Sequence, residues 1–282
     1  MLETPIALTN TFGVGTVANA QIRHAVAANP GIGRGLATVN PLVFECNDGY
    51  LNDIQALAVQ EAHYAEALAG AGKPFAQGAV GAGRGMSCFS FKGGIGSASR
   101  VASIQPGLRH TVGALVLANF GRLPNLTVAG RPFGRRLAEQ LDRGLAQQGE
   151  NAVIAPEKGS IILLLATDAP LDSRQLRRLS LRAGAGLART GSVFGHGSGD
   201  IALAFSTAYT IPQLAESPMP AMAMLHEARV DPLFEAAAEA CEQAIISALW
   251  HAEGVTGRDG HHRDPIRQAA PDWRQWLSDT EF

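Results

Sequence analysis

The chain has 282 residues, 46% hydrophobic and 17% charged, which is enough apolar material for a sizeable core in one large domain or two modest ones. Its 23 basic and 25 acidic residues give a net charge of −2, which excludes the basic stripe of a nucleic-acid-binding protein and a polybasic membrane patch. The three cysteines, Cys46, Cys88 and Cys241, are widely spaced without a CxxC pair, which argues against a disulfide framework or a structural zinc site.

The amino-terminal sequence MLETPIALTN lacks the charged segment and apolar stretch of a secretory signal. No apolar run reaches membrane-spanning length, and there is no heptad and no repeat of about 20–50 residues. We therefore expect a soluble, cytoplasmic protein that contacts neither a membrane nor a nucleic acid.

The first third of the chain is predicted to alternate strands and helices. Residues 5–10 (PIALTN) and 41–45 (PLVFE) have the compact apolar patterns of strands, and residues 16–28 form a helix after the glycines of FGVGT. An alanine-rich helix is expected over residues 51–71, because apolar positions recur on one face. The alternating segment MSCFSF, residues 86–91, suits a half-buried strand.

The middle of the chain contains two strongly apolar segments. Residues 111–120 (TVGALVLANF) are predicted to form a buried strand, and residues 126–128 a short one. Residues 131–154 are polar and weakly patterned, which suggests a surface linker. Residues 161–166 are continuously hydrophobic and bounded by polar residues, which is typical of a strand buried on both faces.

The last third contains two predicted helices. Asp172 can cap a helix over residues 174–189, and a long amphipathic helix is expected over residues 231–252. Residues 201–207 (IALAFST) form a strand, and residues 254–282 are expected to be a polar, loose tail. Long helices interleaved with buried strands favour an α/β layered domain of stacked sheets with helices outside, rather than a Rossmann sheet.

Two segments resemble ligand sites at first sight. GAVGAGRG, residues 78–85, lacks the GK[ST] ending of a phosphate loop, so close backbone packing is the better interpretation. His261 and His262 have no partner at metal-ligand spacing, so a solvated loop is expected and neither a metal nor a cofactor is predicted. His196, in a glycine-rich loop beside a strand, fits either an active group or a structural histidine.

Small polar residues stand at the ends of several predicted strands. Ser160 follows Gly159 at the start of the most apolar strand, Asn119 ends the strand of residues 111–120, and Ser198 and Asp200 lie in GSGD. Each is explained by a turn or a strand cap. Together they also allow a site in which a hydroxyl nucleophile, an amide donor and a carboxylate converge. No GxSxG elbow is present, so the usual signature of an α/β-hydrolase is missing.

The order of the motifs resembles a known peptidase family. From residue 5 to about residue 262 the chain resembles the family of the L-aminopeptidase/D-esterase and the β-peptidyl aminopeptidases, of the DmpA/BapA type. The resemblance rests on these segments in this order: PIALTNT, NDGYLNDI, GAVGAGRGM, FKGGIGSASR, TVGALVLANFG, KGSIILLLATDAP, RAGAGLART, GSGDIALAFST, DPLFEAAAEACEQAII and ALWHAEGVTGRDGH. It implies a four-layer αββα sandwich with mixed sheets, as in the ornithine acetyltransferases.

The resemblance also implies self-processing at the Gly159–Ser160 bond. A single domain of residues 1–282 would be cut into an α chain, residues 1–159, and a β chain, residues 160–282. Ser160, as the new amino-terminal residue, would be the nucleophile of a serine aminopeptidase that removes amino-terminal residues from small peptides, amides or esters. A homo-oligomer is implied, for which a tetramer is one form.

The family's other functional residues fall on matching positions of this sequence. Ser198 and Asp200 would orient Ser160, although relatives often carry glutamate at the second position, and Asn119 would donate to the oxyanion. Glu3 stands where a relative's acidic residue meets the substrate's free amino group. Thr16 falls where some relatives carry an aromatic hydroxyl that stabilises the oxyanion.

Two alternatives to this function remain open. The relatives begin about a hundred residues earlier, so the chain could be a truncated, uncleaved homologue that acts as a binding or assembly subunit. It could also transfer acyl groups to amino acids, as the ornithine acetyltransferases do. Those enzymes cleave before threonine rather than serine, so KGSII argues against acyl transfer.

Overall fold

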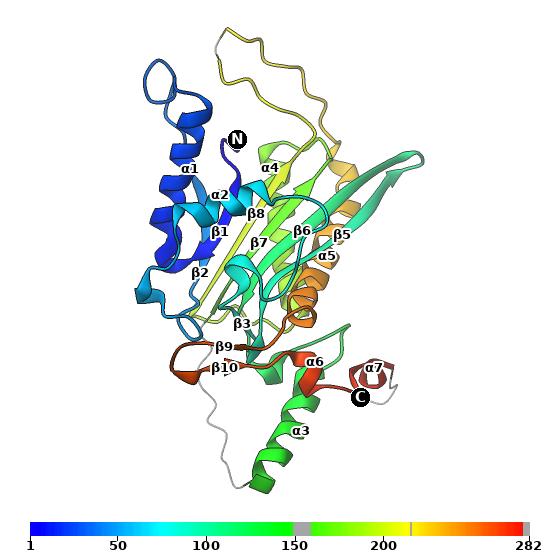
Figure 1. Ribbon diagram of the computed structural model, residues 1–282. Helices are drawn as coiled ribbons and strands as arrows, with labels where there is room; N and C mark the ends of the chain where they lie inside the picture. Colours follow the sequence, from blue (N-terminus) through cyan, green and yellow to red (C-terminus); the bar gives the residue numbers. More distant parts are fainter. Residues whose placement is uncertain (149–158, 215, 279–282) are drawn as a thin grey trace.

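The fold is a sandwich of four layers in the order helices, sheet, sheet, helices. The computed structural model describes residues 1–148, 159–214 and 216–278. Figure 1 shows α1 and α2 on one side of the strands and α4 and α5 on the other. The αββα architecture expected from the sequence is therefore present.

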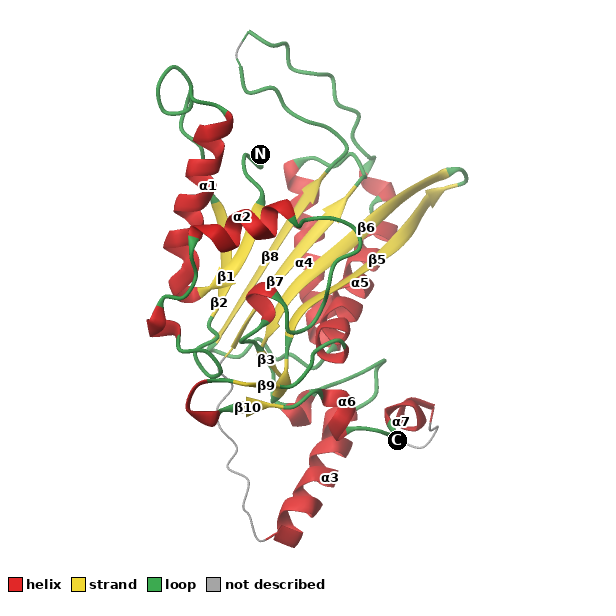
Figure 2. Ribbon diagram, viewed as in Figure 1, coloured by secondary structure: helices red, strands yellow, loops and turns green. Residues whose placement is uncertain are grey.

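The larger sheet has four strands in the order β5-β6-β7-β8. These are β5 (Gly94–Gln105), β6 (Leu108–Asn119), β7 (Gly159–Thr167) and β8 (Ser198–Ser206). β6 pairs antiparallel with both β5 and β7, whereas β7 and β8 are parallel. β7 is an inner strand with apolar side chains on both faces, which explains its continuous hydrophobic sequence. Figure 2 shows the β5–β6 hairpin projecting beyond the helices.

The smaller sheet consists of β1 (Ile6–Asn10) and β2 (Leu42–Cys46), which are parallel. Its inner face packs on the four-stranded sheet through an apolar layer. That layer contains the buried side chains of Cys46, Met86, Leu117, Ile162 and Leu164. The carboxyl end of β2 therefore lies over β6 and β7, where Asn119 and Ser160 are located.

Two pairs of helices cover the outer faces of the sheets. α1 (Val14–Ala28) and α2 (Glu61–Ala69) pack on the β1–β2 sheet through Val17, Ala20 and Tyr64. α4 (Ser173–Arg189) and α5 (Asp231–Trp250) cover the four-stranded sheet. Glycine permits the close contact of β5 with α5, because a Cβ at Gly96 would lie 1.9 Å from the carbonyl oxygen of Ala244.

Shorter elements close the lower end of the sandwich in Figure 1. The short strands are β3 (Ser87–Cys88), β4 (Phe91–Lys92), β9 (Val255–Thr256) and β10 (His262–Arg263). The remaining α-helices are α3 (Phe133–Gln148), α6 (Ile266–Ala269) and α7 (Trp273–Ser278). Short 3-10 turns are η1 (Thr11–Gly13), η2 (Ile54–Ala56), η3 (Gly81–Gly83), η4 (Leu123–Asn125), η5 (Glu227–Arg229) and η6 (Arg258–Gly260).

Most of the strongly patterned predictions are confirmed. The strands expected near residues 5–10, 41–45, 111–120, 161–166 and 201–207 are β1, β2, β6, β7 and β8. The helices expected near residues 16–28, 174–189 and 231–252 are α1, α4 and α5. Asp172 caps α4 as predicted, with its carboxylate accepting from the amide of Gln175 at 2.7 Å.

Three predictions in the first half of the chain are wrong. The helix expected over residues 51–71 is split into η2 and α2, because Leu57 adopts a left-handed conformation with φ 47° that ends the first turn. The strand expected over residues 86–91 is the hairpin β3–β4, which turns at Phe89 and Ser90 with φ of 49° and 69°. The segment of residues 126–128 makes only the bridge from Val128 to Arg131.

Two segments that were expected to be irregular are ordered, and one strand was missed. Within the supposed linker, α3 buries Phe133 and Leu137 in the main core. Residues 149–154 of the expected linker lie outside the described part of the chain. The supposed loose tail, residues 254–282, forms β9, β10, α6 and α7 as far as residue 278 and buries Ile266 and Trp276. The sequence does not predict β5, because the first half of this strand is rich in glycine and serine.

Candidate active site

Ser160 lies at the start of β7, between the ends of two neighbouring strands. The register places Asn119 of β6 on one side of it and Gly199 of β8 on the other. Side chains alternate along a strand, so Ser160 shares the face of Ile162, which packs in the layer between the two sheets. Asn119 shares the face of Leu117 in the same layer. The hydroxyl and the amide predicted to act together are therefore neighbours.

Gly159 occupies a position that no larger residue fits. A Cβ at this position would lie 2.3 Å from the carbonyl oxygen of Asn119 and 2.8 Å from Cα of Phe120. The close approach of β6 thus accounts for glycine before Ser160.

The side-chain amide of Asn119 is held by two main-chain groups. Its Oδ1 accepts from the amide of Ser87 at 2.8 Å, and its Nδ2 donates to the carbonyl of Asn47 at 2.9 Å. The residue is only 7% exposed. Because both ends of the amide are engaged, its orientation is fixed, and Nδ2 still has a second N–H to offer to a reacting oxygen.

Ser198 and Asp200 form a pair on β8 on either side of Gly199. The Ser198 hydroxyl donates to Oδ1 of Asp200 at 2.7 Å. The amide of Gly199, between them, donates to Oγ of Ser160 at 3.4 Å. Among the described residues no hydrogen bond joins either side chain to Ser160 directly, so their link to it runs through the main chain of Gly199.

The other two predicted site residues lie elsewhere. Glu3 stands before the amino end of β1, the end opposite to Asn10, and its Oε2 accepts from the main-chain and side-chain nitrogens of Asn40, both at 3.0 Å. Thr16 lies on α1, which packs on the outer face of the β1–β2 sheet. The structure therefore brings neither residue to Ser160, because the β1–β2 sheet lies between α1 and β7.

The histidines noted in the sequence lie at the surface. The ring of His261 stacks on Tyr50 with 4.6 Å between centroids. Nε2 of His262 lies 3.1 Å from Oδ1 of Asp264, and His196 is exposed in the loop before β8. In residues 1–148, 159–214 and 216–278 no group of three or more His, Cys, Asp or Glu could hold a metal ion.

Lys92 is a polar residue that the sequence interpretation missed. It is completely buried, and its Nζ donates to the carbonyls of Gly83, Met86 and Gly93 at 2.8, 2.7 and 2.8 Å. Burial lowers the pKa of Lys92 to about 7. Within the glycine cluster of residues 78–85, Gly83 provides one of these carbonyls, and a Cβ at Gly83 would lie 2.6 Å from the carbonyl oxygen of Gly78, which confirms close backbone packing.

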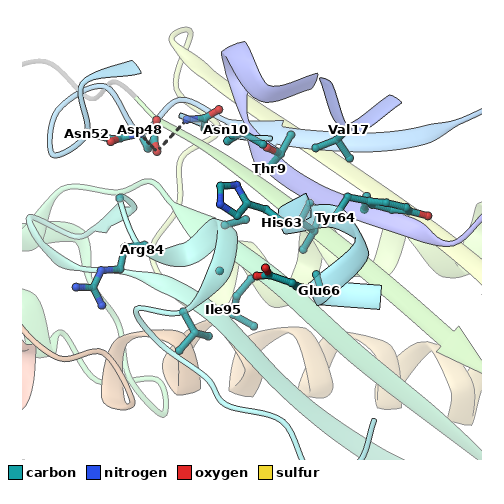
Figure 3. A pocket seen from close by; sticks show the side chains of 18 of the residues that line it. Thr9, Asn10, Val17, Asp48, Asn52, His63, Tyr64, Glu66, Arg84 and Ile95 are labelled. Carbon is teal, nitrogen blue, oxygen red and sulfur yellow. Dashed lines mark hydrogen bonds between the residues drawn. The ribbon is translucent and has the colours of Figure 1, made fainter. Parts of the chain in front are cut away.

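A cavity of about 940 Å³ lies along β1, between α2 and η3. Figure 3 shows Asp48, Asn10 and Asn52 together at one end of it, with the hydrogen bond from Asn10 to Asp48 drawn. Asp48 is 6% exposed, and burial raises the pKa of its carboxyl. Neither Ser160 nor Asn119 lines this cavity, so it is separate from the place where these two side chains are neighbours.

A sequence model of peptidase family S58 matches residues 1–263. The chain belongs to peptidase family S58. The beta-peptidyl aminopeptidase BapA of Sphingosinicella microcystinivorans is 41% identical to it over 265 residues, which is 92% of this chain and 65% of the relative. The S58 chain described here therefore spans slightly less than two thirds of the length of that curated relative.

Solved structures resemble this S58 protein over almost its whole length. The PH0078 protein of Pyrococcus horikoshii OT3 superposes with a TM-score of 0.88 at 46% identity, covering 99% of this chain and 74% of that one. The L-aminopeptidase D-Ala-esterase/amidase of Ochrobactrum anthropi, a prototype of the serine aminopeptidases with a variant of the Ntn-hydrolase fold, gives a TM-score of 0.80 at 34% identity. This superposition covers 95% of the present chain and 73% of the Ochrobactrum anthropi chain. The family and fold predicted from the sequence are confirmed.

None of the described helices combines the length and the apolar composition that crossing a bilayer requires.

Proposed function

We propose that this chain is a self-processing serine aminopeptidase with Ser160 as its nucleophile. The observation that carries the proposal is the placement of Ser160 directly after a sterically required glycine, with the fixed amide of Asn119 opposite it. Such a position can serve two reactions in turn, first cleavage of the chain and then cleavage of a substrate. Membership of family S58 supports the same proposal.

The first reaction is an N-to-O acyl shift. Oγ of Ser160 attacks the carbonyl carbon of Gly159 and loses its proton, the C–N bond to Ser160 breaks, and the nitrogen takes up a proton. The product is an ester between Gly159 and the Ser160 side chain. Water then hydrolyses this ester, which leaves a carboxylate on Gly159 and a free hydroxyl and α-amine on Ser160.

The second reaction uses the new amino terminus. An α-amine has a pKa of about 7.7–8.0, so near neutral pH a useful fraction can accept the proton of the Ser160 hydroxyl. The hydroxyl oxygen attacks the substrate carbonyl, and the second N–H of Asn119 Nδ2 donates to the oxyanion that forms. Gly199, which donates to Oγ, positions the nucleophile between the two neighbouring strands.

The proposed substrates are small peptides, amides or esters with a free amino-terminal residue. The names of the relatives support this class, because one is a beta-peptidyl aminopeptidase and another an L-aminopeptidase and D-Ala-esterase/amidase. We further propose that the protein is a cytoplasmic homo-oligomer. Light scattering coupled to gel filtration would test the oligomer, and a mass equal to one chain would refute it.

The proposal is tested by a denaturing gel and by intact mass. Wild-type protein is expected to give two fragments, residues 1–159 and 160–282, and to release the chromophore of an aminoacyl-nitroanilide. The Ser160→Ala variant should remain one inactive chain. Ser103→Ala, an exposed serine on β5, is the matched control and should behave as wild type. A single wild-type band without turnover of any aminoacyl amide would instead favour a non-enzymatic binding subunit.

A further inference from the structure

The ammonium of Lys92 joins three separate parts of one glycine-rich segment. Its three protons have three main-chain carbonyl acceptors: Gly83 in η3, Met86 before β3 and Gly93 after β4. These acceptors use the full donor capacity of the side chain. In its protonated form the side chain is therefore a cross-link of the main chain with no proton left to donate to a substrate.

The hairpin that Lys92 anchors meets the end of β6 at Asn119 and Phe120. The Ser87 amide donates to Oδ1 of Asn119 at 2.8 Å, and the Phe89 amide donates to the carbonyl of Phe120 at 2.8 Å. The rings of Phe89 and Phe120 lie edge to face, 5.0 Å apart. The position of this hairpin therefore determines where the Asn119 side-chain amide points.

The surroundings of Lys92 act on its charge in opposite directions, and its three carbonyl acceptors hold the side chain in place. Burial opposes its ammonium most strongly and Arg84 adds to this, whereas Cys88 and Asp48 favour the ammonium and offset only part of the cost. The carbonyls of Gly83 and Met86 also accept from main-chain amides, of Met86 at 3.2 Å and of Gly93 at 3.0 Å, so Lys92 supplies a second donor to each. An apolar residue would remove these added bonds and the bond to the carbonyl of Gly93. Among the described polar side chains, Lys92 thus links the glycine loop to the hairpin that holds Asn119.

We infer that Lys92 is a positioning residue for the proposed hydrolase. It holds β3 so that the Ser87 amide orients the side chain of Asn119 toward the carbonyl under attack. The inference rests on the proposed roles of Ser160 and Asn119, but the orientation of Asn119 by the hairpin can be measured without any activity.

The first test is a double-mutant cycle. Lys92→Met keeps the length and apolar stem of the side chain but removes all three donors. Displacement of a catalytic group by about 1 Å can cost roughly 10²-fold, so we expect kcat to fall about 10- to 100-fold while KM changes much less. In an Asn119→Ala background the same substitution should change kcat less than about twofold, because the group that it positions is already absent. An equal loss in both backgrounds would overturn the inference.

The matched control is Gln175→Leu on α4. Gln175 is also buried, and its Nε2 donates to the carbonyl of Leu225 at 2.8 Å, but it lies in the layer on the far side of the sheet. The Gln175→Leu substitution should lower the free energy of unfolding and leave kcat unchanged. A kcat loss equal to that of Lys92→Met would show that general destabilisation is the cause and would overturn the inference.

The second test is independent of turnover. In the Ser160→Ala protein, NMR spectra should show that Lys92→Met, or Lys92→Gln if the methionine variant does not fold, shifts the side-chain amide signal of Asn119. Hydrogen exchange at the Ser87 amide should become at least about tenfold faster. Unchanged signals and exchange would overturn the inference. An inactive, uncleaved wild type would refute the proposed function while this test still decided the role of Lys92.

Discussion

At the scale of single residues, the side-chain amide of Asn119 combines two orienting hydrogen bonds with one N–H that the proposed mechanism uses. Oδ1 accepts from the Ser87 amide and Nδ2 donates one N–H to the carbonyl of Asn47; in the proposed mechanism the second N–H of Nδ2 donates to the oxyanion. Aspartate has the same shape as asparagine but cannot donate, so Asn119→Asp would keep the bond from Ser87 and remove both donors of Nδ2. The proposed mechanism therefore assigns only an orienting contact to Oδ1 of Asn119 and a contact with the reacting oxygen to its Nδ2.

We predict that Asn119→Asp lowers kcat by about 10²–10³-fold, the usual cost of one oxyanion donor, as Asn119→Ala does. Asp keeps the acceptor for the Ser87 amide, but its second oxygen would face the carbonyl of Asn47 in a buried position, so the melting temperature should fall in both variants. Steady-state kinetics and thermal unfolding check both statements. Near-wild-type kcat in either variant would exclude Asn119 as the oxyanion donor.

Gly159→Ala is predicted to slow self-cleavage. The added methyl group would lie 2.3 Å from the carbonyl oxygen of Asn119, so the start of β7 must shift and the hydroxyl of Ser160 with it. The measurement is the fraction of two-chain protein on a denaturing gel over time after synthesis. Gly113→Ala on β6 is the control, since its methyl group would meet only the Ala166 carbonyl oxygen, at 3.9 Å. Cleavage at the wild-type rate in Gly159→Ala would contradict this account.

Lys92 is predicted to make stability rise with pH above neutrality. Burial lowers its pKa from 10.5 to about 7, so between these values the unfolded chain binds the extra proton. The free energy of unfolding then rises with pH, by at most about 1.4 kcal/mol per pH unit, and below pH 7 the cost of burying the charge is fully present. Urea unfolding of Ser160→Ala protein at pH 7 and 9 measures the slope. The slope should be smaller when Lys92→Met is added, and an identical slope in both proteins would refute the prediction.

At the scale of elements, periodic side-chain patterns could be predicted and main-chain approaches could not. The apolar patterns of β7 and α5 predict these elements directly. β5 lacks such a pattern because it begins GIGS, and its glycines lie against α5 and against the glycine cluster of residues 78–85. The turn of β3–β4 uses Phe89 and Ser90 at positive φ, where glycine or asparagine is expected, because burial of the Phe89 ring against Phe120 outweighs the backbone cost.

The same distinction holds for the candidate site. Ser160 and Asn119 carry reactive side chains at strand ends, and both could be found from the sequence. Gly199 contributes an amide and Lys92 acts on carbonyls, so their side-chain types gave no signal of a role. Thr16 and Glu3 were placed by family resemblance alone, without any constraint from the packing of α1 or the start of β1.

Gly96→Ala is predicted to disrupt the contact between β5 and α5. Its methyl group would overlap the Ala244 carbonyl oxygen at 1.9 Å, and both partners are main chain, so relief requires moving a whole helix. We expect a loss of about 3 kcal/mol in the free energy of unfolding. Chemical denaturation measures it, with Gly113→Ala on the adjacent strand as the matched control. A loss below about 1 kcal/mol would contradict the prediction, because β5 and α5 would then separate at little cost to accommodate the methyl group.

At the scale of the whole molecule, the proposed cut runs through the centre of the fold. β5 and β6 belong to residues 1–159, whereas β8 and all of β7 after Gly159 belong to residues 160–282. The β6–β7 pairing from Val112–Thr167 to Asn119–Ser160 therefore joins the two fragments. The helix α5 covers β5 across the same division. Phe133 of α3 also packs on Trp276 of α7, with 5.2 Å between ring centroids. The main core is therefore shared between the fragments.

We predict that cleavage leaves the two fragments associated. Neither fragment can bury its share of the core alone, and each would expose an unpaired strand edge along β6 or β7. Wild-type and Ser160→Ala proteins should elute together in native gel filtration, and both wild-type fragments should be found in that one peak by mass spectrometry. In concentrated guanidinium chloride the wild type alone should separate into two species. Separate elution of the fragments in native buffer would contradict the prediction. Dissociation would also break the β6–β7 pairing that places Asn119 beside Ser160.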